Sequence, residues 1–325
     1  MAETILKLKN LKIEFPDDDG YLEAVRDIEF TLNKGERLGI VGESGCGKSI
    51  TCKAILRLLG EKTRVSGEIL FKDQDVLKLS ISDMYKIRGK EISMIFQEPM
   101  ASLDPLFTVG DQLTETLMLH RNMSREEAWK EGIEMMKLVS IPQPEKRMKQ
   151  YPFEFSGGMC QRIMIAIGLA CHPEILIADE PTTALDVTIQ AQILDLMKQL
   201  NKETGTAIIL ITHDLGVIAE TVERVLVLYA GNIVEEADVH SLFHDAKHPY
   251  TIGLLASIPK IEKDVEELDS IPGTVPSLKK MPAGCRFAPR CPYKKEICEK
   301  EVPCMVQAGG SRVRCWKYSE RWEET

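Results

Sequence analysis

The chain has no long hydrophobic run. Residues 1–15 alternate charged and apolar side chains, and no later run approaches the ~18 consecutive apolar residues of a membrane span. Neither a signal peptide nor a transmembrane segment is expected from this pattern. We therefore expect a cytosolic protein.

Positive charge is scarce relative to negative charge. The 325 residues include 41 Lys and Arg against 50 Asp and Glu, which gives a formal net charge of −9. Such a chain lacks the basic field that holds nucleic acid by counterion release, so DNA and RNA are not expected partners. Internal repeats and low-complexity tracts are also missing. The length suits one large domain with an appendage, or two domains.

A phosphate-binding loop is the strongest motif that is present. Residues 42–49 match G-x-x-x-x-G-K-[ST] at every fixed position, after an apolar run at 38–41 and before a helical pattern over 48–59. Glycines let backbone N–H groups wrap around a polyphosphate. Lys48 supplies charge for the β- and γ-phosphates, and Ser49 a hydroxyl for Mg²⁺. The alternative is a glycine turn that only links strand to helix, which the closing Lys-Ser disfavours. The predicted nucleotide-binding residues are Gly42, Glu43, Ser44, Gly45, Cys46, Gly47, Lys48 and Ser49.

Two strands are expected before this loop. Apolar residues alternate from Leu6 to Phe15 with one change of phase, which predicts a strand with a bulge, and a second strand returns over residues 24–32. They predict a small antiparallel layer. Tyr21, at the turn, is placed either to stack on adenine or to lie half buried on its own hairpin.

The rest of the chain predicts an α/β core with an insert. Residues 98–170 have helical spacing and predict an inserted helical subdomain. An apolar run at 175–178, a helix from about 187 to 202 and a strand at 207–211 form a βαβ step, which favours a parallel sheet. From residue 259 prolines interrupt any long element, so residues 259–325 are predicted to form a loop-rich appendage to a domain of residues 1–258.

Further motifs follow the phosphate loop in an informative order. They are Gln97 at a strand end, the segment Phe-Ser-Gly-Gly-Met-Cys-Gln-Arg at 155–162, Asp179-Glu180, Ala184-Leu185-Asp186 and Thr212-His213. In this order they resemble the ATPase subunits of ABC transporters. Segments 96–105, 248–255, 271–276 and 284–292 are similar to the bacterial dipeptide and oligopeptide importers, a group that also includes nickel importers.

The resemblance implies a P-loop NTPase (RecA-like) fold and an ATP-hydrolysing site. Asp179, with Ser49 and Gln97, would hold Mg²⁺, Glu180 would polarise the attacking water, and His213 would contact the γ-phosphate. A histidine after a strand is otherwise more often a core or surface residue. The residues implied to meet the nucleotide of an opposite subunit are Ser156, Gly157, Gly158, Gln161 and Asp186.

The resemblance also implies partners. A homologous ATPase, identical or not, would pair head-to-tail with this chain, and two membrane permeases would hold the pair at the cytoplasmic face of the membrane as peripheral subunits. A substrate-binding protein would act indirectly. The alternatives are a nickel-importing relative, a soluble ABC ATPase of repair or translation, and a degenerate regulatory subunit. The acidic balance and the tail disfavour the soluble ATPase, and the full set of catalytic residues disfavours the degenerate subunit.

Five of the nine cysteines crowd the tail, which in a reducing compartment suggests metal binding rather than disulfides. Zinc is usual for four cysteines, but the paired C-x₂₋₄-C knuckles of zinc sites are missing, and widely spaced thiolates suit a cubane with one cysteine per iron. The resemblance implies a [4Fe–4S] cluster on Cys285, Cys291, Cys298 and Cys315. Cys304 is a fifth candidate, but Cys315 matches the family's Arg-x-Cys ending. Zinc and free thiols remain alternatives.

Overall fold

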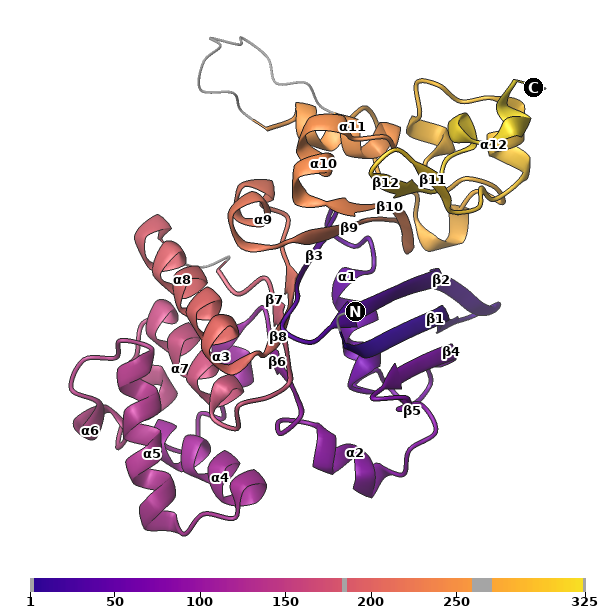
Figure 1. The fold of residues 1–325 in the computed structure, drawn as a ribbon. Helices are drawn as coiled ribbons and strands as arrows, with labels where there is room; N and C mark the ends of the chain where they lie inside the picture. The colour runs from indigo at the N-terminus through magenta and orange to yellow at the C-terminus, as the bar shows by residue number, and fades with distance from the viewer. Residues whose placement is uncertain (1–2, 183–185, 259–270, 324–325) are drawn as a thin grey trace. The chain divides into compact units, whose positions relative to one another are not determined.

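The computed structural model describes residues 3–182, 186–258 and 271–323 (Figure 1). It divides into two compact units. Unit 1 comprises Met1–Glu3, Asn33–Glu36 and Lys78–Ile211, and unit 2 comprises Thr4–Leu32, Arg37–Leu77 and Thr212–Thr325. The predicted α/β class is confirmed, because each unit combines helices with strands.

Unit 2 begins with a four-stranded sheet in the order β2-β1-β4-β5. These strands are β1 (Thr4–Asp17), β2 (Gly20–Asn33), β4 (Arg64–Phe71) and β5 (Gln74–Asp75). The predicted bulge is confirmed, because the register between β1 and β4 shifts between Lys9 and Lys12. Gly67 lies opposite the bulge with φ of +99°, where an added Cβ would stand 2.5 Å from the Asn10 carbonyl oxygen. This close approach requires glycine.

A second set of strands in unit 2 carries the phosphate loop. Strand β3 (Arg37–Val41) runs parallel to β9 (Arg224–Tyr229), and β10 (Asn232–Asp238) pairs antiparallel with β9. Helix α1 (Lys48–Ile55) follows the loop. The predicted extension of this helix to residue 59 is wrong, because Arg57 adopts φ of +51°, which a right-handed helix cannot contain.

The tail joins this sheet through two short strands that the sequence did not predict. Strand β12 (Ser311–Val313) pairs with β10, and β11 (Val306–Ala308) pairs with β12. The other elements of this part of unit 2 are α9 (Leu215–Thr221), α10 (Val239–Asp245), α11 (Pro249–Ala256), η2 (Leu278–Lys280), η3 (Ala288–Arg290), α12 (Glu296–Lys300), η4 (Trp316–Tyr318) and η5 (Glu320–Trp322).

Unit 1 contains three parallel strands. Strand β7 (Ile175–Asp179) lies between β6 (Ile92–Ile95) and β8 (Ala207–Ile211), and all three consist of buried residues. Helix α8 (Val187–Thr204) links β7 to β8 and ends where Gly205 turns left-handed, so the predicted βαβ step is confirmed. Helix α2 (Ile81–Ile87), which precedes β6, was not predicted.

Helices occupy the segment where an insert was predicted. Figure 1 shows α4, α5, α6 and α7 gathered in one group. The elements here are α3 (Pro99–Ser102), α4 (Val109–Arg121), α5 (Arg125–Leu138), α6 (Pro144–Arg147), η1 (Pro152–Glu154) and α7 (Gly157–Leu169). Helix α5 begins with a capping box between Ser124 and Glu127, the arrangement that satisfies the free N–H groups of a first turn.

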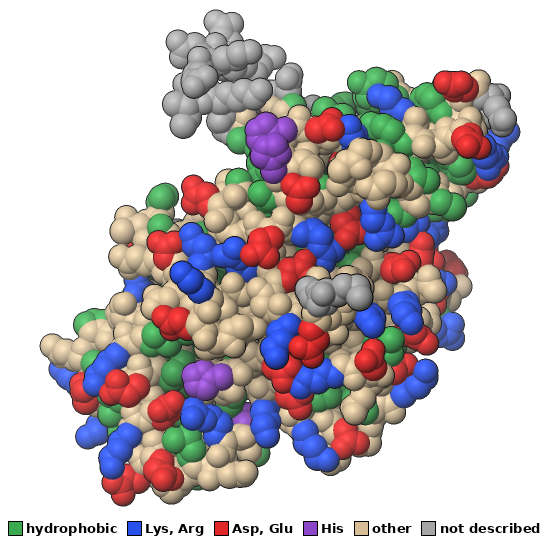
Figure 2. Space-filling view, viewed as in Figure 1, with side chains coloured by type: hydrophobic (Ala, Val, Ile, Leu, Met, Phe, Trp, Pro, Cys, Tyr) green, Lys and Arg blue, Asp and Glu red, His purple; other side chains and the backbone are tan. Residues whose placement is uncertain are grey.

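The surface carries charges of both signs. On the face drawn in Figure 2, basic and acidic side chains are interspersed rather than separated into patches. Within the described ranges, no helix is long and apolar enough to cross a membrane.

Candidate functional site

The phosphate loop of unit 2 is shaped by its three glycines. Gly42, Gly45 and Gly47 have φ values of +152°, +76° and +98°. At Gly42 an added Cβ would stand 2.2 Å from the Leu228 carbonyl oxygen, so any side chain would collide with the end of β9. The loop therefore depends on glycine both for its backbone angles and for its close packing on the sheet.

Helix α1 opens directly from this loop. Gly47 precedes its first turn with no side-chain cap, so the first N–H groups of the helix face the loop without competition from a capping oxygen. Lys48 is only 5% exposed, and its Nζ donates to the carbonyl oxygens of Gly42 (2.8 Å) and Glu43 (3.1 Å). The ammonium group is thus held over the loop, where it can contribute charge to bound phosphates.

Strand β7 of unit 1 ends in the predicted acidic pair. Asp179 is 2% exposed at the strand terminus. Glu180 follows with φ of +48°, an uncommon angle for a residue with a side chain, and its N–H donates to the Ile211 carbonyl oxygen at 2.9 Å. Gln97 Nε2 donates to Glu180 Oε2 at 2.9 Å. The structure therefore brings together Gln97 and Glu180, which the sequence placed 83 residues apart.

Helix α7 carries the Ser-Gly-Gly edge. Ser156 is its N-cap and accepts a hydrogen bond from Met159 N–H at 3.4 Å, while Ser156 and Gly157 are exposed and Gly158 is partly exposed. Gln161 is only 2% exposed, and its Nε2 has no hydrogen-bond partner. Its side chain faces the interior of unit 1, so it does not share the exposed edge that was predicted to meet a nucleotide.

The remaining predicted residues lie at element ends. Asp186 is exposed and caps α8 by accepting from Ile189 N–H at 3.0 Å, whereas Ala184 and Leu185 lie outside the described residues. His213 is exposed in the turn between β8 and α9. Tyr21 is 38% exposed, with the Arg64 guanidinium 3.6 Å from its ring centroid. One face of that ring is therefore already covered by a cation.

The four favoured tail cysteines line one small cavity of unit 2. The cavity walls include Cys285, Cys291, Cys298 and Cys315, together with His248 and Trp316. Cys304 is exposed and does not line the cavity. The backbone ties two of the cysteines together, because Cys285 N–H donates to the Cys298 carbonyl oxygen at 2.8 Å.

Burial controls the chemistry of these thiols. Burial, reinforced by the neighbouring cysteines, raises the pKa of Cys285 to about 12 and that of Cys315 to about 11. The thiols are therefore protonated at neutral pH, and a bound metal would have to displace their protons. Across the described part of the chain, no group of three or more His, Cys, Asp or Glu side chains is arranged to hold a metal ion.

Tyr250 and Arg290, two residues of unit 2 outside the predicted site, contact the phosphate loop. Glu43 N–H donates to Tyr250 Oη at 2.9 Å, and Arg290 forms an ion pair with the Glu43 carboxylate at 2.7 Å. Both residues occur in the segments that carried the resemblance, yet nothing in the local sequence indicates the contact.

Two family models match the chain. The family model described as "ABC transporter" matches residues 25–183, and the model described as "Oligopeptide/dipeptide transporter, C-terminal region" matches residues 234–298. The dipeptide transport ATP-binding protein DppD of Bacillus subtilis (strain 168) is 49% identical over 99% of this chain and 97% of its own length. The oligopeptide transport ATP-binding protein OppD of Escherichia coli (strain K12) is 48% identical over 97% of this chain and 94% of its own.

A solved structure is also similar. The dimeric post-hydrolysis state of the ATP-binding cassette MJ0796, bound to ADP and Pi, matches with a TM-score of 0.66 and 31% sequence identity. The match covers 72% of this chain and 99% of that one.

Proposed function

Because the chain belongs to the ABC transporter family, as the ATP-binding relatives that match nearly its whole length show, we propose that it is the ATP-hydrolysing subunit of a peptide importer. The observation that carries the cargo assignment is the match of residues 234–298 to the C-terminal region of oligopeptide and dipeptide transporters. That region lies outside the ATPase motifs, so its similarity concerns the type of transporter rather than ATP chemistry.

We propose an ATP site with divided roles, as membership of the family implies. The glycine loop and Lys48 would bind the phosphates of ATP. Ser49, Gln97 and Asp179 would hold Mg²⁺, which would shield the negative charge that develops on the phosphate oxygens. Glu180 would polarise the attacking water, and His213 would contact the γ-phosphate. The hydrogen bond of 2.9 Å from Gln97 Nε2 supports this role, because it orients the Glu180 carboxylate.

We propose that two ATPase subunits pair head-to-tail. Ser156 and Gly157 present an exposed helix start that no other described element of unit 1 covers, as expected for an edge that meets a partner's nucleotide. The similar cassette MJ0796 is itself dimeric with ADP and Pi. The chain alone should therefore hydrolyse ATP poorly, and its specific activity should rise with protein concentration or with the second ATPase. Full activity from a monomer at high dilution would contradict the pairing.

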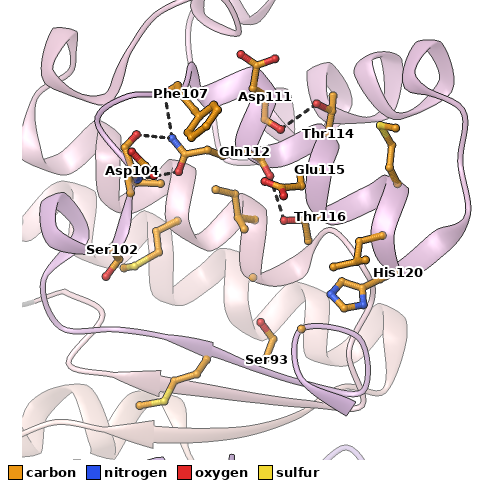
Figure 3. A pocket seen from close by; sticks show the side chains of 18 of the residues that line it. Ser93, Ser102, Asp104, Phe107, Asp111, Gln112, Thr114, Glu115, Thr116 and His120 are labelled. Atoms are coloured by element: carbon orange, nitrogen blue, oxygen red, sulfur yellow. Dashed lines mark hydrogen bonds between the residues drawn. The ribbon is translucent and has the colours of Figure 1, made fainter. Parts of the chain in front are cut away.

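A pocket of unit 1 is the proposed seat of a permease. It has a volume of about 1190 Å³ and lies between β6, the segment after Gln97, and α4 (Figure 3). Gln112 stiffens its rim, because its Nε2 donates to the carbonyl oxygens of Asp104 (2.9 Å) and Phe107 (3.1 Å). Phe107 is 55% exposed at this rim. An exposed apolar side chain at the rim of a pocket can pack against the apolar face of an amphipathic helix of a membrane partner.

We propose a [4Fe–4S] cluster in the tail. The four cysteines fit the group in one respect: they line the same cavity, whereas exposed Cys304 does not line it. Each cysteine that binds a cubane takes a different iron, so the four cysteine sulfurs stand further apart than they would around a single ion. Four cysteines that cannot hold one metal ion can therefore still hold a cubane. The role that the chain offers such a cluster is structural, because the cavity belongs to a small core of Ala288, Ile297, Cys298 and Trp316.

The proposal is tested by uptake in cells that carry this chain as the only copy of its subunit. Lys48→Ala should abolish uptake of radiolabelled di- and oligopeptides, and the tagged wild-type chain should recover two permeases from membranes. Loss of nickel uptake with normal peptide uptake would instead support the nickel-importing alternative. Recovery of no permease would support a soluble ATPase.

A further inference from the structure

We propose that Arg290 is a positioning residue for ATP, which orients and neutralises the Glu43 carboxylate within the phosphate loop. The guanidinium meets the carboxylate with two hydrogen bonds, from Nη1 to Oε2 at 2.7 Å and from Nη2 to Oε1 at 3.1 Å. Such a two-point contact fixes the direction of the carboxylate as well as its distance. Glu43 lies inside the loop, directly after Gly42, so its position and that of the loop are linked.

The arginine itself is firmly held. Its side chain is 5% exposed, against 29% for that of Glu43. Nε donates to the Pro272 carbonyl oxygen at 2.9 Å, and Nη2 donates also to that of Ile271 at 3.2 Å. Because the backbone of the tail anchors the guanidinium, the guanidinium in turn fixes the direction of the Glu43 carboxylate.

Tyr250 adds a second contact from the same side. It accepts from Glu43 N–H, and its ring lies 4.7 Å from that of Tyr229 and 5.5 Å from that of Phe287. Its own N–H donates to His248 Nδ1 at 3.1 Å, which fixes the start of α11. The buried aromatic group thus holds the backbone of Glu43, while Arg290 holds its side chain.

A further tail arginine, Arg286, is linked to the loop through residues 230–231. Arg286 is 3% exposed and donates from Nη1 to the Ala230 carbonyl oxygen. The next residue, Gly231, donates its N–H to the Cys46 carbonyl oxygen at 2.8 Å. The segment that contains Cys285 and Cys291 therefore contacts the phosphate loop directly through Arg290 and indirectly, by way of residues 230–231, through Arg286.

The charge of Glu43 gives this contact a consequence for nucleotide binding. An unpaired carboxylate inside the loop would repel the polyphosphate, and Arg290 neutralises it in a partly desolvated place where Coulomb interactions are strong. Without Arg290, the carboxylate is free to turn and compete for Lys48. Loss of the arginine should therefore weaken ATP binding, and removal of the carboxylate should restore it.

The test is a double-mutant cycle on the full chain. Arg290→Met, Glu43→Gln and the double variant are compared for ATP affinity by equilibrium binding and for KM and kcat in the assembled transporter. We expect Arg290→Met to raise Kd and KM about tenfold with kcat within about twofold, and we expect this increase in Kd only while the Glu43 carboxylate is present. The double variant should bind like Glu43→Gln, a suppression that a merely structural role of the arginine would not produce.

Controls separate this effect from misfolding. Arg321→Met removes an equally bidentate pair of the same tail, with Glu301 at 2.8 and 3.0 Å, and should leave Kd unchanged. Arg290→Lys should bind ATP better than Arg290→Met, because it keeps the charge. If Arg290→Met does not fold, Arg290→Lys takes its place in the cycle, and the same comparisons with and without Glu43→Gln decide the matter.

Two results would overturn the inference: an Arg290→Met Kd within twofold of wild type, or a double variant as weak as Arg290→Met. The inference rests on the proposed ATP site, and the wild-type chain distinguishes the two failures. A wild type that binds no ATP refutes the proposed function, whereas equal binding by wild type and Arg290→Met refutes only the role of Arg290.

Discussion

The amide of Gln97 donates a hydrogen bond of 2.9 Å to the carboxylate of Glu180. The two residues come from different strands of unit 1, since Gln97 follows β6 and Glu180 follows β7, and these strands are parallel neighbours. Their carboxyl ends therefore meet at the same edge of the sheet. A neutral amide can orient the carboxylate without taking its charge, which a group that polarises water must keep.

Glu180→Gln should separate binding from hydrolysis. The variant keeps the size of the side chain and the phosphate loop, so ATP affinity should remain within about twofold. Turnover in the assembled transporter should fall by roughly 10²–10⁴, the contribution expected of a general base. Steady-state phosphate release and ATP binding measure the two quantities. Near-normal turnover would assign the base to another residue.

Lys48→Ala should affect both binding and hydrolysis. In the proposed site the buried ammonium would attract the bound phosphates in the ground state and in the transition state, so Kd should rise at least about tenfold, the equivalent of ~1.4 kcal/mol. Lys53→Ala, in the last turn of the same helix, is the matched control and should bind ATP normally. ATP binding by Lys48→Ala with wild-type affinity would show that the loop does not act as proposed.

Phe107→Asp should uncouple the ATPase from its membrane partner. A charge on the exposed rim of the pocket opposes burial of an apolar helix there, while unit 2 and its phosphate loop are unchanged. We expect normal ATP affinity but a several-fold loss of permeases recovered from membranes. Phe153→Asp is the control, since Phe153 is 65% exposed and does not line the pocket. An equal loss of recovered permeases in both variants would refute the pocket as the permease-binding site.

The tail cysteines should differ in iron retention. Protein purified without oxygen should be brown and carry about four irons and four labile sulfides per chain if one cubane is present. Cys315→Ser should lose iron and Cys304→Ser should keep it, because only Cys315 lines the cavity. One equivalent of zinc in a colourless protein would refute the cluster. Iron retained by Cys315→Ser but lost from Cys304→Ser would show that Cys304, and not Cys315, is the fourth ligand.

Thiol reactivity gives a check on the iron-free chain. Because burial raises the pKa of Cys285 to about 12 and that of Cys315 to about 11, few thiolates form at these positions at pH 8. Exposed Cys304 should be alkylated first, and labelling of Cys285 and Cys315 should increase as the pH rises toward those values. Mass spectrometry of labelled peptides measures the order. Early labelling of Cys285 would contradict the buried cavity.

Local features of this protein could be predicted from the sequence. The phosphate loop, the Ser156 cap of α7 and the end of β7 at Asp179 each depend on a few consecutive residues, because glycine angles, capping and strand burial are short-range effects. The bulge in β1 was readable for the same reason, since it changes the alternation of side chains within one strand.

Contacts between distant residues were decided by the tertiary structure. Arg290 and Glu43 are 247 residues apart, and no periodicity links them. Strand β12 has only three residues, too few for a pattern, and forms because β10 offers an unpaired edge. Tertiary packing also decided that Cys315 and not Cys304 lines the cavity. It likewise decided the burial of Gln161 and the contact between Arg64 and the ring of Tyr21. In each case the partner lies elsewhere in the chain, so only packing could select it.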